Sequence, residues 1–299
     1  MVCTVSAGTA SGYYLSEQAR YYTEGKEAIG RWYAPSASLG LSDGAEIDDS
    51  VFERLHSGLD EVGRPLTQNA DGSHANRVAG YDLTFSAPKS VSVIWALEIT
   101  DRRNAIEAAH DIAVRKALDT VNANAGFTRR GKGGERLEPV QMTGAIFRHG
   151  ESRPTDQPNG TIEADPQLHS HVVVFNLAHR DDGTWGSIDG RHLYRWKMAA
   201  GAVYRAELAS QLQTLGYAVE RTDEKGLFEI AGVPQSVRDD FSGRRREITA
   251  ALKAQGLESA DAPALAAAIT KAGRRGKALG RETDRHAQWS ARADSMSGG

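Results

Sequence analysis

The chain has 299 residues, 40% hydrophobic and 25% charged, which is typical of one large or two ordinary globular domains. A formal net charge of −3 excludes a basic surface spread over the whole molecule, so any anion-binding surface must be local. Cys3, the only cysteine, excludes an internal disulfide framework and thiolate metal clusters. We find neither a secretory signal nor a run of ~18 apolar residues, and therefore expect a cytoplasmic protein.

The first half of the chain alternates short strands with helices. A strand is expected at V-C-T-V, and after Gly12 a helix follows that carries two tyrosine pairs. A polar helix begins near Asp48. Residues 80–85 (G-Y-D-L-T-F) alternate as a half-buried strand does, and Pro88 ends or displaces that strand. Residues 101–121 predict an amphipathic helix.

The second half predicts two apolar strands, one long helix, a hairpin and a helical end. In chain order these are a strand over 142–150, the strand Val172–Phe175 opened by a turn containing Pro166, a helix over Met198–Leu215 closed by Gly216, a hairpin over 217–230, and basic-edged helices from about 235 to a flexible S-M-S-G-G tail. These elements predict an α/β fold with several antiparallel connections.

One motif imitates a nucleotide-binding loop. G-F-T-R-R-G-K-G (126–133) matches a phosphate-binding loop until its last position. Gly133 stands there in place of the Ser or Thr that would hold magnesium, and a helix precedes the motif where a strand is required. We interpret this stretch as a basic hairpin or surface loop.

Three histidines mark the ends of two apolar strands. His169 and His171 open the second strand and share one face, because side chains alternate across a strand. Such a pair fits half of a metal site, and it equally fits two imidazoles that hydrogen-bond to nearby backbone. His149 ends the preceding strand, so the three imidazoles converge if the two strands are antiparallel neighbours. Three imidazoles that leave positions for water or substrate describe an open, catalytic metal site.

Asp82 and four tyrosines are the further candidates. Asp82 projects from its strand opposite the apolar side chains, where a carboxylate commonly accepts the N–H of a ligating histidine; an ordinary strand-edge aspartate is the alternative. The pairs Tyr13-Tyr14 and Tyr21-Tyr22 lie eight residues apart and, taken alone, are typical packing residues. Beside a charge-neutralised phosphate, however, a phenol becomes a feasible nucleophile.

Four motifs in order carry a resemblance to a known family. They are the two Tyr-Tyr pairs, D-L-T-F-S-A-P-K-S-V-S, F-R-H-x-x-S-R and D-P-Q-L-H-S-H, within about residues 12–245. This series resembles the MobF-type conjugative relaxases of the TrwC/TraI group, and it matches their relaxase domain only. Two departures are Ser170, where threonine is usual and which faces away from the metal, and a longer link between Arg153 and Asp165.

The resemblance implies a fold and a division of the chain. The fold is a two-layer α/β (α+β) domain in which a central antiparallel sheet carries the His triad and helices flank it. A catalytic relaxase core, similar to HUH endonucleases, spans 1–234. A helical segment with basic edges, part of the same domain and DNA-embracing in the family, spans 235–299.

The activity implied by the resemblance is site- and strand-specific nicking and strand transfer at a plasmid origin of transfer. It is a metal-dependent transesterification through a 5′-phosphotyrosyl intermediate, which initiates and terminates conjugative DNA transfer. The roles carried over are a divalent metal (Mg, Mn or Zn) held by His149, His169 and His171, Tyr13 as first nucleophile, Tyr21 as second, Tyr14 and Tyr22 as alternatives to them, and Asp82 as the group that orients a histidine or takes the tyrosine proton.

The implied partners follow from the same resemblance. They are single-stranded DNA at the nic site, relaxosome accessory DNA-binding proteins, and the coupling protein of a type IV secretion system. The protein would act in the donor cytoplasm and reach the recipient covalently attached to DNA. The resemblance implies that Arg153 contacts a DNA phosphate or base. From their charge, further candidates are Lys89, Arg129, Arg130, Lys132 and Arg244–Arg246, each of which, taken singly, is more often a solvated surface charge.

Two other functions fit part of this pattern. A sequence-specific single-stranded DNA-binding protein with a structural His₃ metal site would bind DNA without a covalent product. A His₃ metallohydrolase or cupin-like oxygenase would act on a small molecule. That last function would leave the paired tyrosines without a role, and the acidic ligand usual downstream of a cupin His-x-His is missing from H-S-H-V-V-V-F-N.

Overall fold

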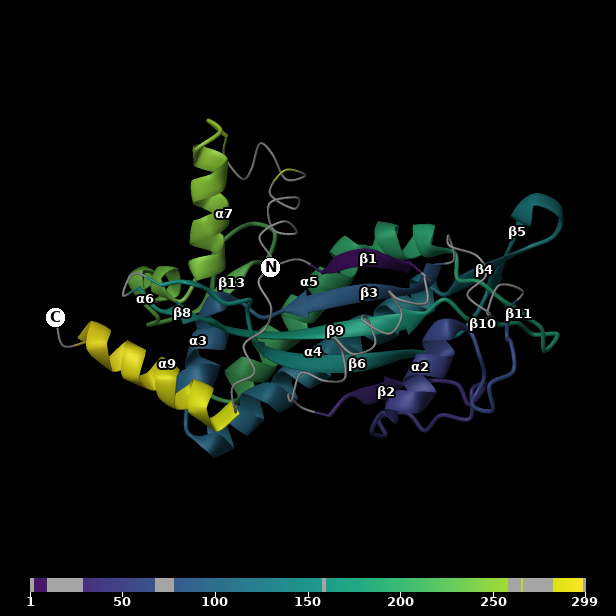
Figure 1. The fold of residues 1–299 in the computed structure, drawn as a ribbon, viewed down its shortest axis with the longest axis horizontal. Coiled ribbons are helices and arrows are strands. Elements are labelled where there is room, and N and C mark those ends of the chain that lie inside the picture. Colours follow the sequence, from purple (N-terminus) through teal and green to yellow (C-terminus); the bar gives the residue numbers. More distant parts are fainter. Residues whose placement is uncertain are drawn as a thin grey trace.

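A five-stranded antiparallel sheet forms the centre of the molecule, with the strand order β1-β3-β9-β6-β2 (Figure 1). The computed structural model describes residues 3–9, 29–67, 78–157, 160–257, 265 and 282–297. The strands of this sheet are β1 (Thr4–Thr9), β2 (Arg31–Tyr33), β3 (Val78–Ser86), β6 (Gly144–Glu151) and β9 (Pro166–Phe175). The antiparallel pairing of β6 with β9, expected from the sequence, is confirmed.

The central strand β9 is apolar on both faces near its end and polar on one face near its start. Val172 and Val174 pack into the larger core with the helices, whereas Val173 and Phe175 pack into a smaller core on the opposite face. Because side chains alternate along a strand, His169 and His171 share the face of Val173. The strand begins at Pro166 itself, so this residue belongs to β9 and not to the turn that the sequence predicts before it.

Two long helices, α4 (Thr100–Ala125) and α5 (Gly190–Thr214), pack on each other and cover one face of the sheet. The expected helix over 101–121 is thereby confirmed. Helix α5 begins eight residues before the predicted Met198, because the Asp189 side chain accepts from the Arg191 N–H and caps an earlier start. It ends at Thr214, one residue before the predicted Leu215, and Gly216 after this C-cap adopts a left-handed φ of 89°.

The smaller core lies under α2 (Asp49–Ser57) on the other face of the sheet. Asp48 caps this helix by accepting from the Ser50 and Val51 N–H groups, close to the predicted start. The Phe52 ring meets Phe147 of β6 edge-on and lies beside Phe175 of β9. Helix α2 therefore covers the part of this face where β9 ends (Figure 1).

Helix α3, a hairpin and the C-terminal helices pack around the other end of the sheet. Helix α3 (Lys89–Leu97) starts directly after Pro88, and the predicted hairpin of β12 (Val219–Arg221) and β13 (Phe228–Ile230) docks on it. The Ile230 N–H donates to the Ser90 hydroxyl at 2.7 Å. The C-terminal elements are α6 (Gln235–Asp240), α7 (Gly243–Lys253) and α9 (Glu282–Ser297), so the helix extends into the stretch expected as a tail.

Short two-stranded sheets lie at both ends of the central sheet. The basic stretch 126–133 lies in a hairpin of β4 (Phe127–Arg130) and β5 (Arg136–Pro139), as predicted. The link between Arg153 and Asp165 contains the hairpin of β7 (Thr155–Asp156) and β8 (Ile162–Glu163). A further pair is β10 (Ala178–His179) with β11 (Trp185–Gly186). Within the described ranges, every helix falls short of the length or apolar composition that a membrane crossing needs.

Gly150 lies where the pairing of β6 with β9 becomes irregular, between His149 and Glu151. A Cβ at this position would overlap the outer edge of the Trp95 ring, which is 3% exposed. The Trp95 ring is itself fixed, because its Nε1–H donates to the Glu107 carboxylate at 2.9 Å. The close approach of β6 to α3 therefore requires glycine.

Gly150→Ala is expected to lower the free energy of unfolding by about 1–3 kcal/mol, the usual cost of overpacking a core. The measurement is the denaturant midpoint at constant m-value. In a Trp95→Phe background, whose smaller ring relieves the overlap, the same alanine should cost less. Equal cost in both backgrounds would show that the overlap with Trp95 is not the cause.

Candidate metal centre

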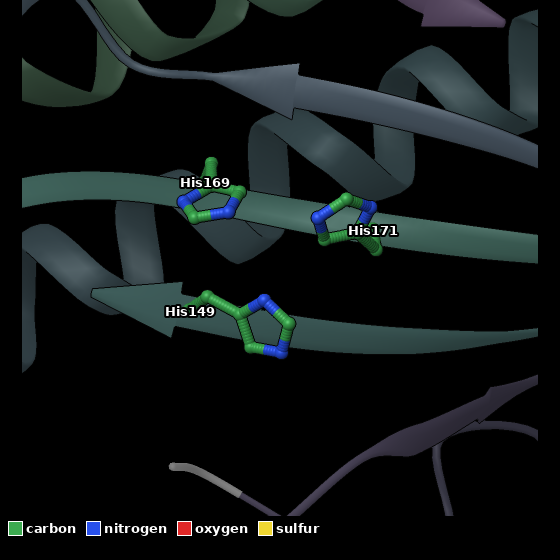
Figure 2. Close-up of side chains that lie close together, drawn as sticks. All are labelled: His149, His169 and His171. Carbon is green, nitrogen blue, oxygen red and sulfur yellow. The ribbon is translucent and has the colours of Figure 1, made fainter. Parts of the chain in front are cut away.

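The register of two strands brings three imidazoles together. His149 of β6 lies directly opposite His169 of β9, and His171 follows two residues later on the same face. Figure 2 shows the three rings facing one another across the two strands. Their ring centroids are 5.2–5.3 Å apart, and one nitrogen from each ring lies within 4.8 Å of the others. The convergence expected from the sequence is confirmed.

Hydrogen bonds determine which nitrogen two of these rings offer. His169 Nδ1 lies 2.7 Å from the Gln167 carbonyl oxygen, which can only accept, so Nδ1 carries the proton. His171 Nδ1 lies 2.8 Å from Asp82 Oδ2 and 3.0 Å from Oδ1, and the same argument applies to this carboxylate. In both rings Nε2 therefore carries the lone pair.

Asp82 and Thr84 form the shell behind His171. Both project from β3 on the His face of the sheet, where Thr84 is the register partner of His171. The Thr84 hydroxyl lies 3.3 Å from Asp82 Oδ1 and 3.4 Å from His171 Nδ1. A carboxylate in this position fixes the tautomer of the imidazole. Of the two surroundings considered for Asp82, the structure therefore shows the contact with a histidine N–H.

The donor set fits a divalent ion. Three neutral imidazoles on rigid neighbouring strands are ligands that zinc, manganese and related ions accept, and they leave coordination positions for water or substrate. His149 is 2% exposed, whereas His169 and His171 are half-buried. Cys3, the one thiol of the chain, takes no part, because it is buried in the larger core against α5.

The C-terminal helix α9 is anchored to the strand ends that carry the histidines. Arg285 pairs with the buried Glu151 at 2.8 Å, and Arg292 pairs with the buried Asp165 at 3.0 Å. Between them Trp289 donates from Nε1 to the Ala164 carbonyl at 2.9 Å. The helix therefore braces the segments directly after His149 and before His169.

The predicted DNA contacts occupy different surroundings. Lys89, at the start of α3, donates from Nζ to the Pro166 carbonyl at 2.8 Å, and Arg153 lies half-buried in the loop after β6. The β4–β5 hairpin, which holds Arg129, Arg130 and Lys132, lies at the end of the sheet opposite the start of β9 (Figure 1). The structure thus separates these candidates into two groups at opposite ends of the sheet.

Several of these basic side chains form ion pairs with nearby carboxylates of the same protein. Arg129 Nε is 3.7 Å from Asp189, and Arg130 pairs with Glu138 and Asp182. Arg244 pairs with Glu247 at 2.8 Å, whereas the side chains of Lys132 and Arg245 are exposed. Tyr13, Tyr14, Tyr21 and Tyr22 lie outside the described residues, and their roles stay predictions.

The sequence interpretation missed His110 of α4. Its ring is fully buried, with Nε2 2.8 Å from the Ser170 hydroxyl and Nδ1 2.8 Å from the Tyr204 hydroxyl. The available signal was a histidine inside the apolar stripe of a helix, at the position where Ile106, Ala113 and Val114 are also buried.

A central antiparallel sheet that carries a histidine triad on one face and long helices on the other defines a metal-binding α/β domain. The chain matches the model of the TrwC relaxase family over residues 7–296 and belongs to that family. The MobF-type resemblance found in the sequence is thereby confirmed.

The relatives agree in sequence and fold. The multifunctional conjugation protein TraI of Escherichia coli K12 is 35% identical over 272 residues, which cover 87% of this chain and 14% of TraI. The conjugative relaxase TrwC in complex with oriT DNA, in a metal-bound structure, is 30% identical with a TM-score of 0.83 over 98% of this chain and 99% of TrwC. TrwC complexed with a 27-mer DNA that comprises the recognition hairpin and the cleavage site is 30% identical with a TM-score of 0.82, again over 98% of this chain and 99% of TrwC.

Asp165→Ala is expected to lower the free energy of unfolding by about 1–3 kcal/mol, because it leaves the Gly243 N–H without its buried acceptor and removes one of the two carboxylates that pair with Arg292, which keeps Asp240. The denaturant midpoint measures this loss. Arg64→Ala is the matched control, since it breaks the exposed Arg64–Asp60 pair and should change the midpoint little. Equal losses in both variants would contradict the anchoring of α9 through Asp165.

Lys89 predicts a pH dependence of stability. Burial, as the largest cause, lowers its pKa to about 8 from the usual 10.5, so the unfolded chain binds the proton more tightly. Stability should therefore rise between pH 8 and 10.5, by about 3 kcal/mol relative to Lys89→Met, which removes the charge. Urea unfolding of both proteins across this range measures the difference. Parallel pH profiles would contradict a depressed pKa at Lys89.

Proposed function

We propose that this chain is a DNA relaxase, a metal-dependent transesterase that nicks one strand at a plasmid origin of transfer. The observation that carries this proposal is the triad of His149, His169 and His171 with Asp82 behind it. It lies in a chain that is 30% identical, over almost its full length, to the relaxase TrwC, which was solved with oriT DNA and metal bound.

In this proposal His149, His169 and His171 hold the divalent ion, Mg, Mn or Zn. When bound, the ion offsets the charge on the non-bridging oxygens of one phosphodiester and makes its phosphorus more electrophilic. Neutral imidazoles suit this task, because they leave the full charge of the ion facing the phosphate. The strands hold the three donors before DNA binds, which reduces the reorganisation needed during the reaction.

The nucleophile we propose is Tyr13. Its Oη attacks phosphorus in line with the P–O3′ bond, which breaks to leave a 5′-phosphotyrosyl link and a free 3′-hydroxyl. One phosphodiester is exchanged for another, so the reaction is reversible without an external energy source. Tyr21 would attack a second strand in the same manner at the end of transfer, while Tyr14 and Tyr22 remain the alternatives within each pair.

Two roles were open for Asp82, and its contacts favour the orienting role. Both carboxylate oxygens lie within 3.0 Å of His171 Nδ1, and Oδ1 also lies near the Thr84 hydroxyl. A carboxylate engaged in this way holds the imidazole and its tautomer more effectively than it accepts a proton from a tyrosine. We therefore assign Asp82 to orientation of His171.

A cavity supports a DNA-contact surface at the far end of the sheet. Its volume is about 830 Å³, and its lining includes Arg129, Arg180 and Arg191 together with aromatic side chains of Tyr81, Trp185 and Tyr194. Asp189 also lines it and pairs with Arg129 and Arg191. Arginine guanidinium groups beside aromatic rings suit both phosphates and stacked bases. We propose that DNA extends from the triad to this cavity, with Arg153 and Lys132 as additional contacts.

The remaining partners are proposals from the family alone. The chain spans 14% of the length of the curated relatives that it matches, so relaxosome accessory proteins and the type IV coupling protein are proposed for the complete transfer machinery. We place the nicking step in the cytoplasm of the donor cell.

The test is a covalent adduct. Labelled single-stranded oligonucleotides that carry the cognate origin are incubated with the protein and Mn²⁺ or Mg²⁺, and the mixture is resolved on a denaturing gel. We expect an adduct that is lost in Tyr13→Phe and retained in Tyr14→Phe. Retention in Tyr13→Phe with loss in Tyr14→Phe would reassign the nucleophile.

Ligand variants separate the competing functions. His171→Ala should abolish the adduct, and Asp82→Asn should slow its formation by about 10–100-fold while higher Mn²⁺ restores part of the rate. Tight DNA binding without any adduct would instead support the single-strand binding protein with a structural metal. Absence of DNA binding would favour a small-molecule metalloenzyme.

A further inference from the structure

One turn of α4 lies directly behind the histidine triad, on the opposite face of the sheet. Glu107, His110 and Asp111 are spaced i, i+3 and i+4, so their side chains share one face of the helix. All three make polar contacts with the strands that carry the triad. This is unusual for a sheet–helix interface, which elsewhere in this core is built from apolar side chains.

The contact to β9 is made at Ser170, between the ligands His169 and His171. Ser170 faces the helices because its neighbours face the metal side, and it is 0% exposed. Its hydroxyl lies 2.8 Å from His110 Nε2, and His110 Nδ1 lies 2.8 Å from the Tyr204 hydroxyl of α5. Both long helices are thus joined to the strand at the residue that separates two ligands.

The contact to β6 is made at Arg148, the residue before His149. Arg148 donates to Glu107 Oε2 at 2.7 Å and also to Asp111. Arg148 and Ser170 are direct register partners across β6 and β9. The same turn of α4 therefore makes hydrogen bonds to both members of the cross-strand pair Arg148–Ser170, on the face of the sheet opposite the histidines.

Physical arguments favour positioning over bulk stabilisation for these groups. Burial lowers the pKa of His110 to about 3, so its ring is neutral and uses one donor and one acceptor in two hydrogen bonds. Apolar side chains of similar size would stabilise such an interface at least as well, whereas a fully satisfied polar network specifies one geometry. Ser170 faces away from the triad, which excludes a direct proton path from His110 to the site.

We propose that the turn Glu107–Asp111 of α4 is a positioning platform for the metal site. His110 fixes β9 through Ser170, and Glu107 with Asp111 fixes β6 through Arg148, so that the three ligand nitrogens stay in register. This inference rests on the proposed metal site. It assigns no contact with DNA or metal to the platform.

The experiment measures metal binding rather than nicking. Mn²⁺ affinity is determined by titration followed by electron paramagnetic resonance, and Co²⁺ loading is followed by the visible absorption spectrum, which reports ligand geometry. We expect Ser170→Ala to weaken Mn²⁺ binding about 10-fold, as loss of a group that orients ligands does, and to shift the Co²⁺ spectrum. Ser170→Thr keeps the hydroxyl and should restore wild-type affinity and spectrum.

Leu118→Ala is the matched control, because Leu118 is buried in the same helix away from these contacts. It should lower stability while leaving affinity and spectrum unchanged; equal effects in Leu118→Ala and Ser170→Ala would overturn the platform. If Ser170→Ala does not fold, Tyr204→Phe, which deletes one hydroxyl, should weaken Mn²⁺ binding in the same direction. An unchanged Tyr204→Phe would then overturn the proposal.

The two proposals fail in different ways. Wild-type affinity and spectrum in Ser170→Ala overturn the platform while the metal site stands. A wild-type protein that binds neither Mn²⁺ nor Co²⁺, or binds them equally well after His171→Ala, overturns the metal site and the platform with it.

Discussion

The register between β6 and β9 is the constraint on which the rest of this structure depends. A slip of one residue would turn His169 and His171 toward the helices and bring Ser170 to the metal face. Two apolar cores oppose such a slip, since Phe147 and Val173 must reach the core under α2 while Val172 and Val174 reach the larger core. The site is therefore a consequence of how the two cores share one strand.

Near the triad, beyond the part of the sheet that α2 covers, polar contacts add to the apolar packing that sets the register of β6 and β9. Behind the strands are the contacts of α4 to Arg148 and Ser170, and beside them is Asp82 on β3. Beyond the strand ends, Glu151 and Asp165 hold α9. Each of these groups is buried or half-buried, so each hydrogen bond is protected from competition with water and restricts the strands more than a surface contact would.

The periodic elements and the triad could be predicted from the sequence, because both follow from spacing alone. Alternation along 80–85 and around His169 identified β3 and β9. The antiparallel pairing of β6 with β9 then placed His149 beside His169 and His171. Boundaries were less accurate where a cap decides them, as at Asp189 before α5. The role of His110 could not be predicted, because a histidine in an apolar stripe forms no recognisable sequence pattern. It follows only from the hydrogen bonds of His110 with Ser170 and Tyr204, which are distant in sequence.

The contacts of the cations show what charge in a sequence leaves out, namely which basic side chains are already paired within the protein. Arg130 is paired with two carboxylates and Arg244 with Glu247, while the Lys89 ammonium points at a backbone carbonyl. Releasing any of these groups to a phosphate would first cost the contact that it already makes. With a net charge of −3, the DNA binding that we propose must then come from a restricted surface. At the far end of the sheet Arg129 and Arg191 also pair with Asp189, so the aromatic rings of that cavity, which can stack on bases, support the proposed DNA contact more than its charges do.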